Sequence, residues 1–188
     1  YFSFHIDSNQ LPTVWQPSQV TTNGQTDVLV ADDGTFRPSE TLEPGTEVKV
    51  VSWRPLTDAE RLRAAGTDYP GAVEAQYTQM PSETPDRVYE RTDEVTAGAT
   101  TPYNKSVAIE RHLEQTPYSL NASHEEGEPV ADQFLFEMDK GYCQYYATTM
   151  VAMLRSEGVP ARYVGGYAPG VPSGENKYTV TTSQAHAW

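Results

Sequence analysis

The sequence of 188 residues predicts an α+β fold, in which one helix packs on an antiparallel sheet behind a small β-rich segment. Three observations support this prediction. Short β-branched segments separated by glycine turns fill residues 1–56, helical patterns begin at Thr57, and a helix followed by extended segments begins after Gly141. We therefore divide the chain into a β-rich N-terminal segment, 1–56, and a core, 57–188.

The N-terminal segment is predicted to form strands at residues 26–30 and 47–53. Both stretches are rich in β-branched residues and alternate in polarity. The Asp33-Gly34 and Pro44-Gly45 pairs between them are typical of turns. These features indicate a small β lobe.

Helices are expected from Thr57 onward, because a capping threonine followed by acidic residues opens the first of them and Gly66 ends it. The pattern predicts helices at residues 57–66, 70–79, 85–97 and 103–115. In the last helix, Val107, Ile109 and Leu113 form an apolar stripe. We expect Lys105 and Glu110 to face water.

The overall charge limits the possible partners. Twenty-six acidic residues against 13 basic ones give a formal charge of −13, spread along the whole chain. This charge disfavours nucleic acid and anionic membranes as partners, so we expect neither. Self-repulsion of this size is relieved at high ionic strength, so the composition fits a salt-adapted, halophilic protein as well as an acidic mesophilic one.

The single cysteine lies at the predicted start of a helix. Gly141 interrupts the preceding chain, and apolar residues then follow Cys143 at helical spacing, at positions 147, 150, 151 and 154. Gly158 and Pro160 end this helix. Extended segments are predicted at 161–167, 177–182 and 184–188, with a turn at 169–176. The layout is one helix backed by an antiparallel sheet.

A thiol in the first turn of a helix has a special chemical environment. Unpaired backbone N–H groups and the helix dipole favour the thiolate and can stabilise an oxyanion. In an extended segment, His186 and Trp188 project to one face, where the imidazole could serve as the base. The alternative is that Cys143 only fills space in the core, as most lone cysteines do.

The other candidate sites are interpreted as structural. His5, His112 and His124 have no comparable setting, and the acidic stretch 124–128 lacks the second histidine of a metal site. The sequence also lacks a phosphate-binding loop, a dinucleotide fingerprint and a serine-hydrolase elbow. We therefore expect neither a cofactor nor a metal.

The motifs after residue 134 resemble the transglutaminase-like superfamily. They are FLFE at 134–137, GYC at 141–143, LR at 154–155, GVPAR at 158–162, GGY at 165–167 and AHAW at 185–188. Upstream, AAGTDYP at 64–70 and the stretch 96–114 are similar to the extracytoplasmic portion of membrane-anchored prokaryotic and archaeal members. The resemblance covers about residues 57–188.

The resemblance implies a cysteine-protease-like core that acts on protein or peptide amides. Cys143 would form a thioester, and His186 would take and return the proton. The family's third catalytic residue is a carboxylate on the strand after the His-Ala-Trp motif, beyond Trp188, so we expect little activity from residues 1–188 alone. The resemblance also implies a soluble fragment of a membrane-anchored parent protein, at the extracytoplasmic face of the cell membrane.

Two functional hypotheses follow from the sequence. The first is an acyltransferase or protease whose thioester is resolved by an amine or by water, so that crosslinking, deamidation and proteolysis all remain open. The second is a non-catalytic module of the same fold, used for binding or architecture, in which Cys143 is a packing residue.

Overall fold

The computed structural model describes residues 1–14, 17–24, 26–31 and 34–188. The chain divides into two compact units, Tyr1–Thr57 and Asp58–Trp188. Asp33, in the first predicted turn, lies outside the described residues.

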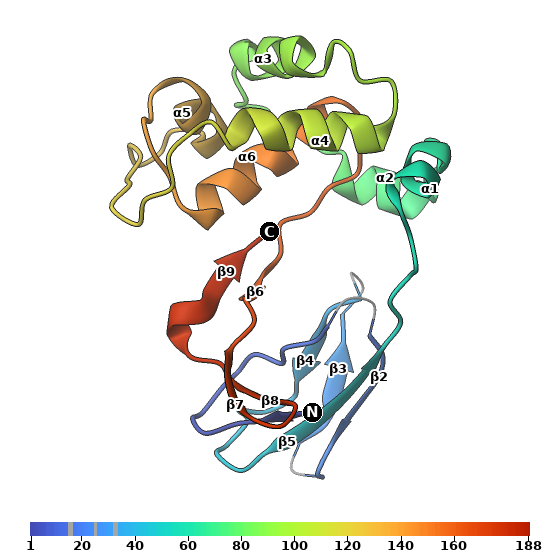
Figure 1. The fold of residues 1–188 in the computed structure, drawn as a ribbon, viewed down its shortest axis with the longest axis vertical. Coiled ribbons are helices and arrows are strands. Elements are labelled where there is room, and N and C mark those ends of the chain that lie inside the picture. The colour runs from blue at the N-terminus through green and yellow to red at the C-terminus, as the bar shows by residue number, and fades with distance from the viewer. Residues whose placement is uncertain (15–16, 25, 32–33) are drawn as a thin grey trace. The chain divides into compact units, whose positions relative to one another are not determined.

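The first unit is made of short strands (Figure 1). They are β1 (Phe2–Ser3), β2 (Pro17–Thr22), β3 (Val28–Val30), β4 (Phe36–Pro38) and β5 (Glu47–Ser52). An antiparallel sheet has the order β1-β5-β2, and β3 pairs with β4. Leu11, Leu42 and Val48 form its buried core. The predicted β-rich character is therefore confirmed.

The second unit contains all of the α-helices in the described part of the chain. They are α1 (Ala59–Ala64), α2 (Gly71–Tyr77), α3 (Asp86–Thr96), α4 (Pro102–Leu113), α5 (Val130–Phe136) and α6 (Cys143–Ser156). Local chemistry sets their starts. The Asp58 carboxylate accepts from the Arg61 backbone N–H at 2.9 Å to cap α1, and Thr101 caps α4 by accepting from the Asn104 N–H at 3.2 Å.

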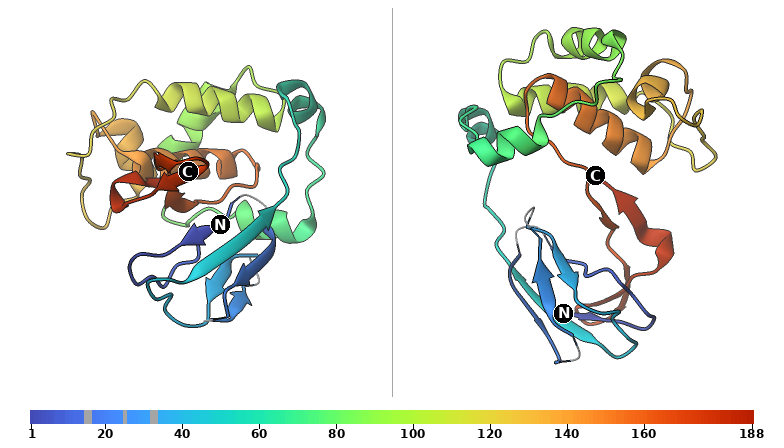
Figure 2. Two further views of the ribbon diagram at one scale, coloured as in Figure 1. Left: turned by 60° about the horizontal axis from the view of Figure 1, so that its bottom comes forward. Right: turned by 180° about the vertical axis from the view of Figure 1, so that it is seen from behind.

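Helix α6 lies at the centre of the second unit and packs against α3, α4 and α5 (Figures 1 and 2). The core cluster joins residues of three helices, α4, α5 and α6. It consists of Ile109, Leu113, Phe134, Tyr145, Met153 and Leu154. Of the α4 stripe, Ile109 and Leu113 are buried as predicted.

The prediction that Lys105 faces water is wrong. Its ammonium group lies 2.5 Å from a carboxylate oxygen of Glu157, which follows α6, and the lysine side chain is only 25% exposed. The orientation of Lys105 is set by its ion pair with a residue 52 positions away in sequence, which the local helical pattern does not reveal.

The remaining strands follow α6 in two antiparallel pairs. They are β6 (Gly165–Tyr167), β7 (Val171–Gly174), β8 (Lys177–Thr179) and β9 (Ala185–Ala187), with a short 3-10 helix, Thr182–Gln184, before β9. Strand β6 pairs with β9, and β7 with β8. Strand β6 begins later than the predicted extended segment at 161–167, and the predicted turn at 169–176 contains β7.

Residues 161–164 lie outside strand β6 because part of this stretch is bonded to other elements. The backbone N–H of Ala161 donates to the Tyr77 carbonyl at 3.0 Å. The Ala161 carbonyl accepts from Nε of Arg155 at 2.8 Å. These contacts fix the start of the connection between α6 and β6, whereas Val164, next to β6, exchanges both backbone hydrogen bonds with Trp188 at 2.8 and 2.9 Å.

Candidate active site

Cys143 is the first residue of α6, and its thiol is free and partly buried. The preceding residue, Tyr142, is extended, and its carbonyl accepts from the N–H groups of Tyr145 at 2.8 Å and Tyr146 at 3.4 Å. The N–H groups of Cys143 and Gln144 donate to no described residue. The thiol therefore lies beside two open donors at the positive end of a fourteen-residue helix.

Gly141 sets where this helix begins. A Cβ atom at this position would lie 2.4 Å from Cε2 of Phe134, a ring that is 2% exposed. The Gly141 N–H donates to the Pro117 carbonyl at 3.0 Å, and its carbonyl accepts from the Ser119 N–H at 2.7 Å. The close contact with Phe134 explains why the sequence has a glycine two residues before the thiol.

Aromatic rings surround the first turn of α6. Tyr145 is 4% exposed, and its ring lies edge-on to that of Tyr142, with centroids 4.6 Å apart. Burial, together with hydrogen bonding to Tyr142, raises the pKa of the Tyr145 phenol. His124 Nδ1 lies 3.2 Å from the Tyr145 hydroxyl. Through this contact, His124 helps to position Tyr145 in the first turn of α6, consistent with the structural role expected for it from the sequence.

His186 lies in the middle of β9, opposite Gly166 of β6. Its ring is 4.9 Å from that of Trp188 at an interplanar angle of 74°, so the two side chains share one face as the alternation predicted. A Cβ on Gly166 would lie 3.2 Å from Trp188 Cζ3, which shows that the indole covers this glycine. The glycine leaves room for the indole that packs against the imidazole.

The two predicted catalytic residues lie on elements that pack against one another, α6 and β9. Within the described residues, Cys143 and His186 are not hydrogen-bonded to each other, and neither ring nitrogen of His186 bonds to an Asp or Glu. The structure therefore brings together the elements that carry the thiol and the imidazole, while the two side chains make no direct bond.

The other end of α6 is anchored to the rest of the unit. Arg155, in its last turn, donates to the carbonyls of Ala161 and, at 3.0 Å, of Gln79. Glu157, next to the helix, accepts from Lys105 and from the hydroxyl of Thr96. Anchoring at this end limits sliding or tilting of the helix that carries the thiol.

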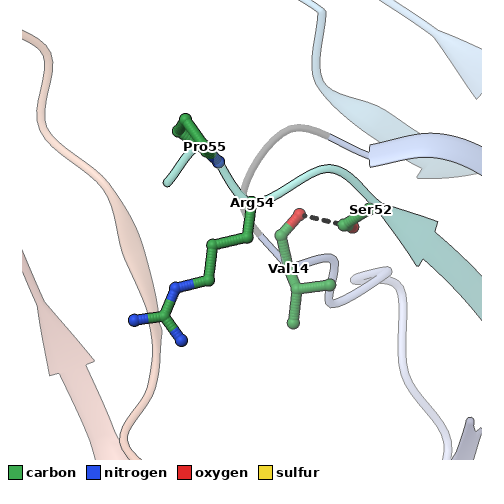
Figure 3. A pocket seen from close by; sticks show the side chains of 4 residues that line it. All are labelled: Val14, Ser52, Arg54 and Pro55. Carbon is green, nitrogen blue, oxygen red and sulfur yellow. Dashed lines mark hydrogen bonds between the residues drawn. The ribbon is translucent and has the colours of Figure 1, made fainter. Parts of the chain in front are cut away.

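The remaining candidates for a site carry no matching chemistry. A pocket in the first unit is lined by Val14, Ser52, Arg54 and Pro55, and the Ser52 hydroxyl is occupied by a 3.2 Å bond to the Val14 carbonyl (Figure 3). Among the described residues, no group of three His, Cys, Asp or Glu side chains could hold a metal.

No helix in the described part of the chain is both long and apolar enough to cross a membrane.

Comparison with known proteins identifies a family. The model of the transglutaminase-like superfamily matches residues 89–188. The protein YebA of Bacillus subtilis, which is uncharacterised, is 34% identical over 122 residues, or 60% of this chain. A protein-glutamine gamma-glutamyltransferase of Pseudomonas aeruginosa is 28% identical over 87% of this chain. The chain spans only 17% and 24% of the lengths of these two proteins.

A solved structure shows the same fold. The periplasmic domain of TgpA from Pseudomonas aeruginosa superposes with a TM-score of 0.67 at 24% identity, over 97% of this chain and 66% of that one. The predicted α+β, cysteine-protease-like transglutaminase fold is thereby confirmed.

Proposed function

Because this chain belongs to the transglutaminase-like superfamily, we propose that it catalyses thiol-dependent acyl transfer or hydrolysis on protein or peptide amides. The observation that carries the proposal is the position of Cys143. Its thiol begins α6 beside two backbone donors without partners, and α6 packs against the strand that bears His186.

The chemistry assigns one role to each residue. His186 takes the thiol proton, and the sulfur of Cys143 attacks the amide carbonyl carbon. The N–H groups of Cys143 and Gln144, which have no partner among the described residues, donate to the carbonyl oxygen as negative charge develops on it. The amide C–N bond then breaks, and His186 returns its proton to the leaving nitrogen. This step leaves an acyl group bound to sulfur as a thioester.

The second half of the reaction sets the outcome. An amine that attacks the thioester gives a crosslink, whereas water gives deamidation of a glutamine or cleavage of a main-chain amide. The P. aeruginosa relative named as a protein-glutamine gamma-glutamyltransferase supports the glutamine side-chain amide as the donor. In this reaction, a carboxylate orients the His186 ring and completes a Cys-His-Asp triad.

We also propose that the chain is a domain of a membrane-anchored protein, exposed outside the cytoplasm. Both curated relatives are several times longer than this chain, and the similar solved structure is a periplasmic domain.

Product analysis tests the proposed reaction. The protein is incubated with a glutamine-containing peptide, with and without a primary amine, and the products are weighed by mass spectrometry. Amine incorporation, or conversion of glutamine to glutamate, is expected for the full-length parent protein, with little product from residues 1–188 alone, and should be lost in Cys143→Ala. His186→Ala should slow the reaction by about 10²- to 10⁴-fold. Equal product from Cys143→Ala would show that Cys143 is not the nucleophile, and the absence of product from the natural protein would favour the non-catalytic module.

A further inference from the structure

We propose that Trp188 is a positioning residue, which holds the imidazole of His186 in the orientation needed to take the thiol proton. The inference rests on the proposed function and deepens it, because it names a second group, besides the orienting carboxylate, that fixes the base. The two rings meet edge-on, with centroids 4.9 Å apart and an interplanar angle of 74°. Such an aromatic contact favours one relative orientation of its two rings.

The backbone of Trp188 is anchored to the strand pair. Its N–H donates to the Val164 carbonyl at 2.9 Å, and its carbonyl accepts from the Val164 N–H at 2.8 Å. Two residues earlier, His186 is paired with Gly166 in the same antiparallel register. Side chains two residues apart on a strand project to the same face, so the ladder itself sets the spacing between the indole and the imidazole.

Gly166 provides the space that the indole occupies. A Cβ at this position would lie 3.2 Å from Cζ3 and 3.9 Å from Cη2 of Trp188. The indole therefore lies diagonally across the strand pair, over the glycine opposite His186, an arrangement that aromatic side chains can reach. The φ angle of Gly166 is negative, so the backbone conformation does not require a glycine here. The requirement comes from the indole.

A role in stability alone fits Trp188 poorly. The residue is 52% exposed, whereas its neighbour Ala187 is 6% exposed. Hydrophobic stabilisation follows the apolar area removed from water, so a half-open indole contributes less to it than a buried one. The contacts that the indole does make, with Gly166 and His186, place its effect at the base.

The indole and the carboxylate act on different freedoms of the same ring. A carboxylate bonded to one ring nitrogen sets the tautomer of His186, whereas the indole limits the rotation of the ring. A misplacement of about 1 Å can cost up to about 10²-fold in rate. Because the imidazole transfers a proton and does not bind the substrate, loss of the indole should lower kcat and leave KM nearly unchanged.

The first arm of the test needs no catalysis and uses residues 1–188. Three-bond couplings between the Hα and Hβ protons of His186, measured by NMR, report whether its side chain keeps one rotamer. We expect one rotamer in the natural sequence and averaging in Trp188→Leu and Gly166→Ala. The matched control is Gly165→Ala on the same strand, where the nearest atom lies 3.9 Å from the added methyl group. Unchanged couplings in both test variants, or equal averaging in the control, would overturn the proposal.

The second arm measures amine incorporation by the full-length parent protein. Trp188→Leu should lower kcat about tenfold and change KM by about twofold at most, and Trp188→Phe, which keeps an aromatic ring, should recover most of kcat. Gly166→Ala should lower kcat in the natural background but not further in Trp188→Leu, because both changes act through one contact. Losses that multiply in the double variant, or a change in KM alone, would refute the positioning role. Absence of product from the natural protein would instead refute the proposed reaction, and the NMR couplings would still decide whether the indole holds the imidazole.

Discussion

Replacing Gly141 by alanine tests how tightly the start of α6 is packed. The new methyl group would lie 2.4, 3.1 and 3.2 Å from three atoms of the Phe134 ring. That ring cannot easily move, because it is 2% exposed and packs against Tyr145 at 5.9 Å and edge-on to Tyr146 at 4.8 Å. Overpacking of this kind costs about 1–3 kcal/mol of folding free energy.

Urea titration followed by circular dichroism at 222 nm measures this cost, because the described α-helices all lie in the second unit. The matched control is Gly98→Ala, where a methyl group meets no atom within 4 Å, and we expect a change within about 0.5 kcal/mol. Adding Phe134→Leu to Gly141→Ala should recover part of the loss, with a coupling of about 0.5–3 kcal/mol. Equal stabilities of the two alanine variants would refute the packing argument.

Three further predictions concern charge. Burial alone would raise the pKa of the Glu157 carboxyl, but hydrogen bonds from Lys105 and Thr96 outweigh it and hold the pKa below its ordinary value. The charged Glu157 carboxylate therefore stabilises the fold above the unfolded pKa of about 4.3, and this stabilisation is lost as the pH falls through the folded pKa. In urea titrations, Glu157→Gln should lower the free energy of unfolding by about 1–3 kcal/mol at pH 7 and by much less near pH 3. The Arg87 guanidinium donates to both carboxylate oxygens of buried Asp132, at 2.5 and 2.6 Å. A lysine cannot make this two-point contact, so Arg87→Lys should lower the melting temperature. An unchanged melting temperature would show that the second contact does not stabilise the fold. The net charge of −13 predicts that the melting temperature rises between about 0.1 and 1 M NaCl, and a flat response would contradict salt adaptation.

Local patterns were sufficient where the fold depends on neighbours in sequence. The glycine before Cys143 and the apolar spacing after it predict α6, and strand alternation places His186 beside Trp188. The family motifs lie in these same stretches, so the elements expected to carry the site could be inferred from the sequence.

Contacts between distant segments escaped prediction. Lys105 looked solvent-facing because its partner, Glu157, lies beyond another helix. The Tyr118–Gly141 bridge joins two single residues and leaves no strand pattern to detect. Tyr145 is polar enough to be read as exposed, yet it is buried because its ring packs against other aromatic rings and its hydroxyl lies within hydrogen-bonding distance of His124.

The most direct test of the central claim is covalent capture of the thioester on Cys143. The protein is mixed with an activated p-nitrophenyl ester of a blocked glutamine-mimicking acid, quenched with acid, and mapped by peptide mass spectrometry. The account predicts an acyl group on Cys143 that is released by hydroxylamine, and slower acylation in His186→Ala by about 10²-fold or more. Acylation of other residues alone, or equal rates with and without the imidazole, would contradict it.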